Sequence, residues 1–327
     1  MKKIVFALSL FMLLLTQSCS NNINPVSAGS SQKDWEGNYP QFNTAYKDSL
    51  LCASTRGIGT SFEPSVFILN KDGSGMHALT NNWFTFGASW SPRRWKIIFI
   101  QDSGLANLET GLFMMNSDGT QKKCLTQPGE IVFGDAAWSP DGNTIAYIEV
   151  DSSAAYVRGR VKLMNPDGTN RRTITGWYVS LNRVTWSPDS KQIAFAGVDS
   201  TANNQIYTMN TDGTDIKVLF TYPEDCYSPS WSPDGNLIAF STLVNIDGGY
   251  YTEILTYDFN AHRLHQITNS KSFNDKPTWS SDSKSIIFAS TPSGQTAGSA
   301  LFKIDVTGSN LIQLTNNNAD DFDPSWY

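Results

Sequence analysis

The stretch Trp231-Ser-Pro-Asp-Gly-Asn-Leu-Ile-Ala-Phe240 decides the fold, because near-copies of it recur along the chain. It predicts a short strand ending at Trp231, a tight turn, and a returning apolar strand. In a type I turn, Pro at the second position pre-sets φ, Asp suits the third, and Gly supplies freedom at the fourth. The copies are Trp138-Ser-Pro-Asp-Gly and Trp186-Ser-Pro-Asp-Ser, with weaker forms at Trp90-Ser-Pro-Arg-Arg and Trp279-Ser-Ser-Asp-Ser.

Six tryptophans mark the repeat, and the spacings from Trp90 to Trp326 are 48, 48, 45, 48 and 47 residues. That period is typical of propeller blades with four strands each. A second motif, Ile206-Tyr-Thr-Met-Asn-Thr-Asp-Gly213, marks a third strand and its turn, and a fourth strand ends each unit, as at Leu314-Thr315. The sequence therefore predicts an all-β chain that folds as a six-bladed β-propeller of four-stranded blades.

The two ends of the repeat array are incomplete in complementary ways. Residues 49–55 match residues 285–291, which form a second strand, so the first blade lacks a first strand at its N-terminal end. Asp323-Pro-Ser-Trp326 is a first strand with no successors. We expect this C-terminal strand to complete the N-terminal blade, because the ring then has no open sheet edge between its ends.

Together these motifs resemble those of the TolB-like family of six-bladed β-propellers, over residues 48–327. The resemblance implies the fold but not one function, since propellers of this kind serve as binding platforms, as accessory domains of peptidases and as lyases. TolB itself carries an additional α/β domain before its propeller, and residues 19–47 are too few to form one.

The N-terminus has the features of a secretory signal. Lys2 and Lys3 precede an apolar run from Ile4 to Leu15, which is too short to span a hydrocarbon layer of ~30 Å as a helix. Because the run ends just before Cys19, residues 1–18 resemble a bacterial lipoprotein signal peptide, with Cys19 as the lipidated residue. Plain secretion is the alternative. Residues 19–47 then form a tether, and we expect a lipid-anchored protein of the cell envelope, at the outer membrane and facing the periplasm or the cell surface.

Charge and cysteine content exclude several classes of function. Removing residues 1–18 takes two lysines and no acid, so 22 basic residues oppose 30 acidic ones and the net charge is −8. Such a surface repels nucleic acid. The three cysteines after Cys19 cannot form a closed disulfide framework. We expect Cys52 in the core, Cys124 on an outer strand, and Cys226 in a loop where it could be exposed.

The spacing within each repeat separates two faces of the ring. Tight turns of constant length lie on one face, and links of variable length lie on the other, where recognition usually occurs. The links before each Trp are rich in aromatic and acidic residues, of which one apolar residue per link is expected to plug the core. The aromatic residues beyond this one plug per link are candidate binding residues, and so are two acids near the channel mouth. They are the aromatic residues Trp83, Phe84, Trp177, Tyr178 and Tyr222 and the acids Asp135 and Asp323. Recognition and simple packing remain equally open for these aromatic side chains.

Catalysis and metal binding have little support in the sequence. His77, His262 and His265 fall on or beside fourth strands, far from the axis, and the Cys and His residues lack the spacing of zinc ligands. We expect no enzyme, no cofactor and no metal site, although the acidic loop 316–323 could offer oxygen ligands to Ca²⁺. The hairpin tryptophans are expected to pack between blades.

The sequence thus favours a monomeric envelope platform that binds a protein or peptide partner through its loop face. A carbohydrate-binding module, in which the aromatic side chains stack on sugar rings, is the alternative. An enzyme acting on a polysaccharide comes third.

Overall fold

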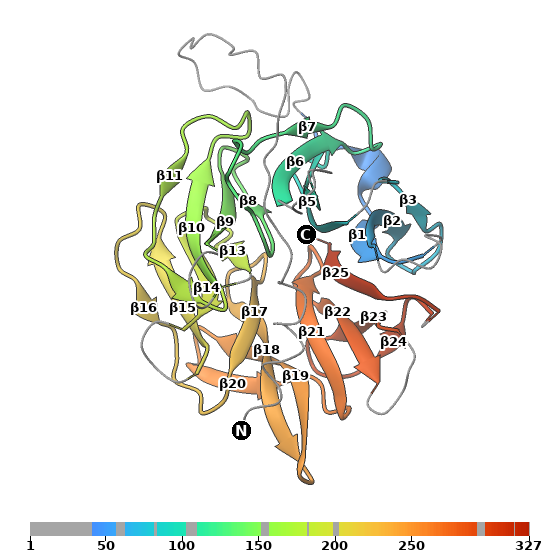
Figure 1. Ribbon diagram of the computed structural model, residues 1–327. Helices are drawn as coiled ribbons and strands as arrows, with labels where there is room; N and C mark the ends of the chain where they lie inside the picture. Colours follow the sequence, from blue (N-terminus) through green and yellow to red (C-terminus); the bar gives the residue numbers. More distant parts are fainter. Residues whose placement is uncertain are drawn as a thin grey trace.

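The computed structural model describes residues 41–56, 63–81, 84–102, 110–151, 157–181, 183–198, 203–292, 298–316 and 318–326. Its strands form an all-β propeller, in which the sheets surround a central axis (Figure 1). The signal peptide, Cys19 and the tether up to residue 40 lie outside the described residues. Within them, the helical element is a single 3-10 turn, η1 (Thr44–Tyr46), and no helix is long and apolar enough to cross a bilayer.

Five hydrogen-bonded sheets make up the ring. The first contains β25 (Asp321–Ser325), β1 (Ser49–Ser54), β2 (Ser65–Asn70) and β3 (His77–Ala78). The second contains β4 (Thr85–Trp90), β5 (Lys96–Asp102), β6 (Thr110–Asn116) and β7 (Lys123–Cys124). The third contains β8 (Ala137–Trp138), β9 (Ile145–Asp151), β10 (Arg158–Met164), β11 (Arg172–Thr173) and β12 (Tyr178–Val179).

The fourth sheet contains β13 (Val184–Trp186), β14 (Gln192–Gly197), β15 (Gln205–Asn210) and β16 (Lys217–Val218). The fifth has eight strands: β17 (Cys226–Trp231), β18 (Leu237–Ile246), β19 (Gly249–Asp258), β20 (Arg263–Gln266), β21 (Ser272–Trp279), β22 (Ser285–Pro292), β23 (Ala300–Asp305) and β24 (Ile312–Gln313). The sequence predicts six blades of four strands. The fifth sheet instead joins two antiparallel groups of four strands through a parallel pair between β19 and β21, at Thr252 and Phe273.

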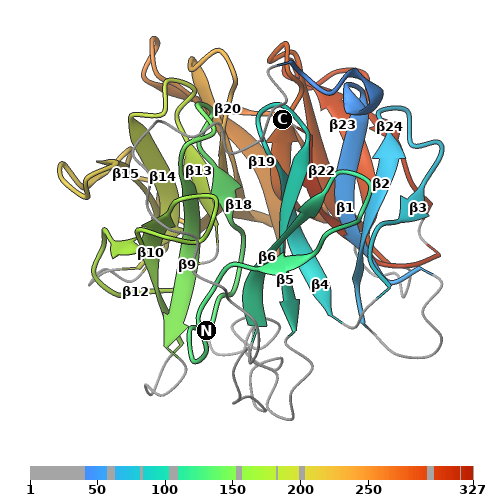
Figure 2. The same cartoon turned by 90° about the horizontal axis from the view of Figure 1, so that it is seen from above.

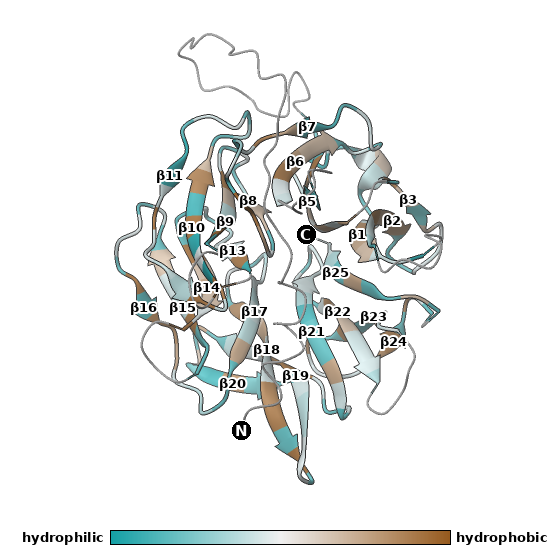
Figure 3. Cartoon of the chain, viewed as in Figure 1, coloured by the Kyte–Doolittle hydropathy of each residue, from teal (hydrophilic) through white to brown (hydrophobic). Residues whose placement is uncertain are grey.

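The predicted closure is confirmed. β25 pairs antiparallel with β1, and Leu51 lies opposite Ser325 while Ser54 lies opposite Asp321. The C-terminal strand therefore supplies the missing first strand of the N-terminal sheet. Buried apolar residues concentrate on the second strand of each group, such as β5 and β18, whereas outer strands such as β11 are largely hydrophilic (Figure 3).

The core consists of six clusters of buried side chains, each shared by two neighbouring groups of strands. Every cluster holds one hairpin tryptophan, which confirms that these residues pack between strand groups. Trp279, for example, is 1% exposed and its indole donates to the Ser230 carbonyl at 2.9 Å. The cluster around Trp326 joins Ile287 and Leu301 of the last strand group to Leu50 of the first, so side-chain packing also closes the ring.

Hydrogen bonds explain the constant turns. In the repeat from Trp231, the Ser232 hydroxyl donates to Asp234 Oδ1 at 2.6 Å and accepts from the Leu237 N–H at 2.9 Å, while Gly235 has a φ of +78°. Burial acts to raise the pKa of Asp234, but hydrogen bonds from Ser232 and Asn236 outweigh it and lower the pKa. Turns of this kind define the turn face, and the opposite end is the loop face. Figure 2 shows the strands running along the axis, with η1 and the C-terminus at the same end.

The cysteine predictions hold except for Cys226. Cys52 is fully buried and Cys124 lies on the outer strand β7. Cys226 is not in an exposed loop but begins β17 and is fully buried, because β18 is long enough to pair with it at Thr242. Burial raises the pKa of Cys226 to about 12.

Candidate functional site

A repeated bulge interrupts several of the inner strands, which are the first strands of each group. The register shifts between Phe86 and Ser89, between Tyr227 and Ser230, and between Asp275 and Thr278. The residue three before the tryptophan has a positive φ in four inner strands, at Gly87, Ser228, Lys276 and Asp323. A β-bulge re-aims a side chain in this way, so in these strands the residue three positions before the tryptophan helps to decide what lines the channel.

Four charged side chains meet at this level of the channel. Asp135 accepts hydrogen bonds from Lys276 Nζ at 3.0 and 3.1 Å and pairs with Arg183 Nε at 3.1 Å. Lys276 also pairs with Asp323 at 3.3 Å. We call these four residues, Asp135, Arg183, Lys276 and Asp323, the axial quartet. Asp135, Arg183 and Asp323 line part of a cavity of about 80 Å³.

The axial quartet is balanced in charge and shielded from solvent. Asp135 and Asp323 are each 9% exposed. Burial opposes the charge on Lys276, but Asp135 and Asp323 outweigh it and raise the pKa of the ammonium above its usual value. Burial raises the pKa of Asp323, against the lowering effect of Lys276. The two acids and the two bases therefore neutralise one another through ion pairs. This arrangement suits a structural role, in which the side chains fill the channel, better than a site of proton transfer.

A second, larger cavity opens on the turn face. It measures about 350 Å³ and has five of the hairpin tryptophans in its wall, with Phe42 and Lys47 among its other lining residues. Nothing in the sequence predicts a cavity here, because the tryptophans repeat for packing. The gap arises only when their rings meet around the axis.

The predicted aromatic residues do not form one patch. Phe84 packs edge-on against Phe86, with 5.3 Å between the ring centroids. The ring centroid of Tyr178 lies 5.1 Å from that of Phe195 and 5.3 Å from that of Tyr207. Tyr222 lies against the cluster around Trp231. Trp83 lies outside the described residues. Packing therefore uses these three described side chains, whereas Asp135 and Asp323, also predicted, are brought together in the axial quartet.

Trp177 has a different environment from its neighbour Tyr178. It is half-buried, and the guanidinium carbons of Arg158 and Arg160 lie 5.0 and 4.5 Å from its ring centroid. Both arginines also pair with acids of β9, Arg158 with Asp151 at 2.8 Å and Arg160 with Glu149. Trp177 thus covers a charged ladder on the third sheet, away from the axial quartet.

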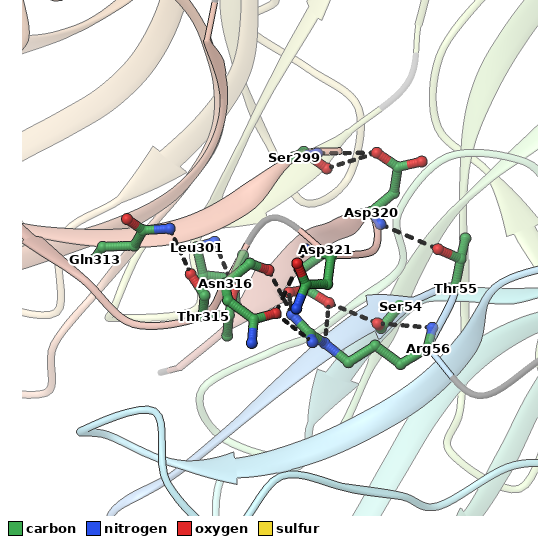
Figure 4. A network of polar contacts seen from close by, with 11 residues as sticks. Ser54, Thr55, Arg56, Ser299, Leu301, Gln313, Thr315, Asn316, Asp320 and Asp321 are labelled. Atoms are coloured by element: carbon green, nitrogen blue, oxygen red, sulfur yellow. Dashed lines mark hydrogen bonds and ion pairs between the residues drawn. The ribbon is translucent and has the colours of Figure 1, made fainter. Parts of the chain in front are cut away.

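The acidic loop before β25 is used for closure. Asp321 is fully buried and pairs with Arg56, and the Ser54 hydroxyl donates to it at 2.5 Å (Figure 4). Asp320 accepts from the Ser299 N–H at 2.9 Å. These carboxylates are occupied by protein donors, and in the part of the chain that the structure describes, no group of three or more His, Cys, Asp and Glu side chains could hold a metal ion.

The β18–β19 hairpin is the feature that the sequence reasoning missed. Both strands have ten residues, and the turn residues Asp247 and Gly248 have φ values of +53° and +82°. An Asp-Gly pair flanked by alternating apolar residues is the usual signal for a two-residue hairpin turn. The Asp-Gly signal is present in residues 242–254, although the spacing of the repeats by itself indicates only a link of variable length there.

A family model for the TolB β-propeller domain matches residues 94–241 and 145–327, which together cover more than half of the chain. The chain belongs to the TolB β-propeller family. The resemblance predicted from the repeats is therefore confirmed. No curated protein matches the chain.

Solved structures similar to this TolB-family chain share its fold at low identity. TolB from Acinetobacter baumannii is 15% identical with a TM-score of 0.72, and the match covers 86% of this chain and 67% of that one. A putative TolB from Agrobacterium tumefaciens is 18% identical with a TM-score of 0.66, over 82% and 99% of the two chains. An oligogalacturonate lyase in complex with manganese is 15% identical with a TM-score of 0.58, over 84% and 76%.

Proposed function

We propose that this chain is a binding scaffold of the bacterial cell envelope, anchored through a lipid on Cys19, and that its loop face holds a protein or peptide partner. It works as a monomer, without a cofactor and without catalysis of its own. The observation that carries this proposal is the contrast between the two faces. The turn face repeats the same short turns, whereas the loop face carries the elements that depart from the repeat, the long β18–β19 hairpin and the extra strand β12.

We count the ring as six blades. Six packing clusters, each with one hairpin tryptophan, support this number. The fifth sheet then contributes two blades, β17 to β20 and β21 to β24, which share a single parallel bridge at Thr252. Such a ring is a rigid platform, because every blade is packed on both sides.

The position of the tether supports an outward-facing loop face. Asn43 donates from its backbone to the Arg93 carbonyl at 2.9 Å, and its side chain donates to the Ser117 hydroxyl at 3.3 Å. Arg93 and Ser117 both belong to turns of the turn face. Because Asn43 is held at the turn face, we propose that this face is the one nearer to a lipid anchor upstream of Asn43, which leaves the loop face open to a partner.

Glycan binding is the second candidate. Tyr250 and Phe273 on the loop face are 46% and 47% exposed, and exposed rings of this kind can stack on sugars. Lyase chemistry is the third, and the manganese-containing oligogalacturonate lyase is the reason to test it.

The test compares the intact protein with a Cys19→Ala variant. Fractionation should find the wild type with membranes and the variant in the soluble fraction; wild type that is already soluble contradicts the anchor. Cross-linking in envelope extract should then yield an adduct with a protein. On a glycan array, the same protein should show no selective binding. Selective glycan binding without a protein adduct would replace the proposal by the second candidate.

A further inference from the structure

The β18–β19 hairpin projects beyond the strands beside it. β17 reaches only to Thr242 of β18, and β20 pairs only with Leu255 to Asp258 of β19. The hairpin is visible as the projection at the lower edge of Figure 1. Residues 243–246 of β18 are therefore paired with β19 on one side and lie beyond β17 on the other.

The open side of β18 carries free backbone groups. The Leu243 N–H donates to the Asp225 carbonyl, so it points away from β19. Because N–H and C=O groups alternate in direction along an antiparallel strand, the backbone of Asn245 points the same way. No backbone hydrogen bond of Asn245 to a described residue outside the hairpin exists. An edge of this kind is a template for another strand.

Exposed aromatic side chains accompany this edge. Tyr250, which lies opposite Asn245 in the register, is 46% exposed. The ring of Tyr251 packs beside the exposed ring of Phe273, with 6.2 Å between the ring centroids. A Cβ at Gly249 would lie 2.6 Å from the Tyr251 hydroxyl, so glycine is needed for the ring to lie along the strand. Apolar rings on both faces of a projecting hairpin provide anchors for a bound segment.

The charges at the two ends of the edge are acidic. Asp247 at the tip has an 80% exposed side chain, and Glu224 is exposed at the base, beside Asp225. Lys271 pairs with Asp247 at 2.6 Å, but it comes from the other side of the hairpin, next to β21. A strand lying along β18 would therefore run between negative charges.

We propose that the edge of β18 at Asn245 binds an extended, lysine- or arginine-containing segment of the partner protein by strand addition. The segment forms backbone hydrogen bonds with Asn245, and its basic side chains face Asp247 and Glu224. This inference rests on the proposed scaffold function and names where the partner binds and what chemistry it presents. Main-chain bonds supply the affinity in this recognition mode, and side chains supply the selectivity.

The probe is a synthetic eight-residue peptide of alternating Val and Lys, labelled for fluorescence anisotropy. The full chain should bind it, and should not bind the Val and Glu counterpart. A Val and Lys peptide that is N-methylated at alternate residues should bind at least about tenfold more weakly, because it cannot complete the backbone bonds. Equal binding of the methylated peptide, or no binding of the Val and Lys peptide, overturns the proposal.

Two variants locate the site. Asn245→Pro removes the outward N–H and should weaken binding at least about tenfold. Asp247→Asn keeps a residue that tolerates positive φ and should weaken binding several-fold at low salt. Asp215→Asn is the matched control, because Asp215 also has a positive φ and pairs with an exposed lysine, Lys217, at 2.8 Å; it lies on the turn face and should change nothing. Unchanged binding in folded Asn245→Pro, or equal loss in both Asp variants, contradicts the inference.

The same variants separate this inference from the scaffold function. If wild type and Asn245→Pro give the same protein adduct in envelope extract, the scaffold function stands and the β18 edge is not its docking site. If neither gives an adduct, the scaffold function itself fails.

Discussion

The guanidinium of Arg94 donates a hydrogen bond to the backbone carbonyl of Trp326, so a turn in the second sheet holds the end of the strand that closes the first. Arg94 also donates to the carbonyls of Ser49 at 2.7 Å and Tyr46 at 3.0 Å. It occupies the turn position where Gly235 stands in the best copy of the repeat, and its φ is +61°. The departure from the consensus in Trp90-Ser-Pro-Arg-Arg thus has a structural cause. Arg56, paired with Asp321, holds the other end of β25.

Replacing Arg94 by Gly should destabilise the protein despite restoring the consensus turn. Glycine relieves the positive φ, but three carbonyls lose a buried, charged donor, and we expect a net loss of about 2–3 kcal/mol in the free energy of unfolding. Urea unfolding measures it. Ser190→Gly, at the same turn position with a φ of +61°, is the control and should cost less than about 1 kcal/mol. Equal effects would show that Arg94 does not act through closure.

Removal of β25 should be much more damaging than removal of tether. A chain lacking residues 321–327 leaves β1 with an open edge and removes Trp326 from its packing cluster. We expect a large fall in melting temperature and aggregation on a sizing column. Deleting seven residues between positions 22 and 32 is the control of equal length. Similar melting of both deletions would contradict closure by β25.

Lys276→Met should destabilise the axial quartet in a pH-dependent way. Removing the cation leaves Asp135 and Asp323 facing Arg183 alone, with Asp275 nearby, and should cost about 3–5 kcal/mol near pH 7. Burial already raises the pKa of Asp323 above 3.8. A raised acid pKa means that the folded state binds the proton more tightly, so this group's contribution to stability rises as pH falls.

The variant should therefore recover part of its lost stability as pH falls from 7 toward the raised pKa of Asp323, relative to wild type measured at the same pH. In the wild type, the contribution of Lys276 is fully present below the usual lysine value of 10.5 and is lost as pH rises through the raised pKa. Lys217→Met breaks an exposed pair with Asp215 and should cost at most about 1 kcal/mol. A pH-independent loss in Lys276→Met would argue against coupling within the axial quartet.

Trp177 and Tyr178 should respond differently to truncation, although they are adjacent in sequence. Tyr178→Ala removes contacts with Phe195 and Tyr207 and should cost about 2–4 kcal/mol. Trp177→Ala loses mainly the stacking on Arg158 and Arg160 and should cost about 1 kcal/mol. Chemical denaturation of both variants compares the two values. Equal losses would show that Trp177 is as much a core residue as Tyr178.

The sequence alone determined the fold of this protein. The Trp-Ser-Pro-Asp-Gly turn, its regular spacing, and the split first repeat predict an all-β propeller closed by its last strand, because turn geometry and strand periodicity are local properties repeated many times. The family match agrees with that prediction. The same local rules also placed the tryptophans between strand groups and Cys52 in the core.

Only the tertiary structure decided how the charged and aromatic residues are used. Asp135 and Asp323 lie 188 positions apart, and their ion pairs with Lys276 and Arg183 depend on how segments of different strand groups meet at the axis. By sequence Phe84, Tyr178 and Tyr222 are surplus aromatic residues, and only their neighbours in three dimensions assign them to packing. Pairing of β19 with β21, the depth of Cys226 and the open edge at Asn245 are likewise decided by contacts between distant segments, which carry no signal in any single stretch of the sequence.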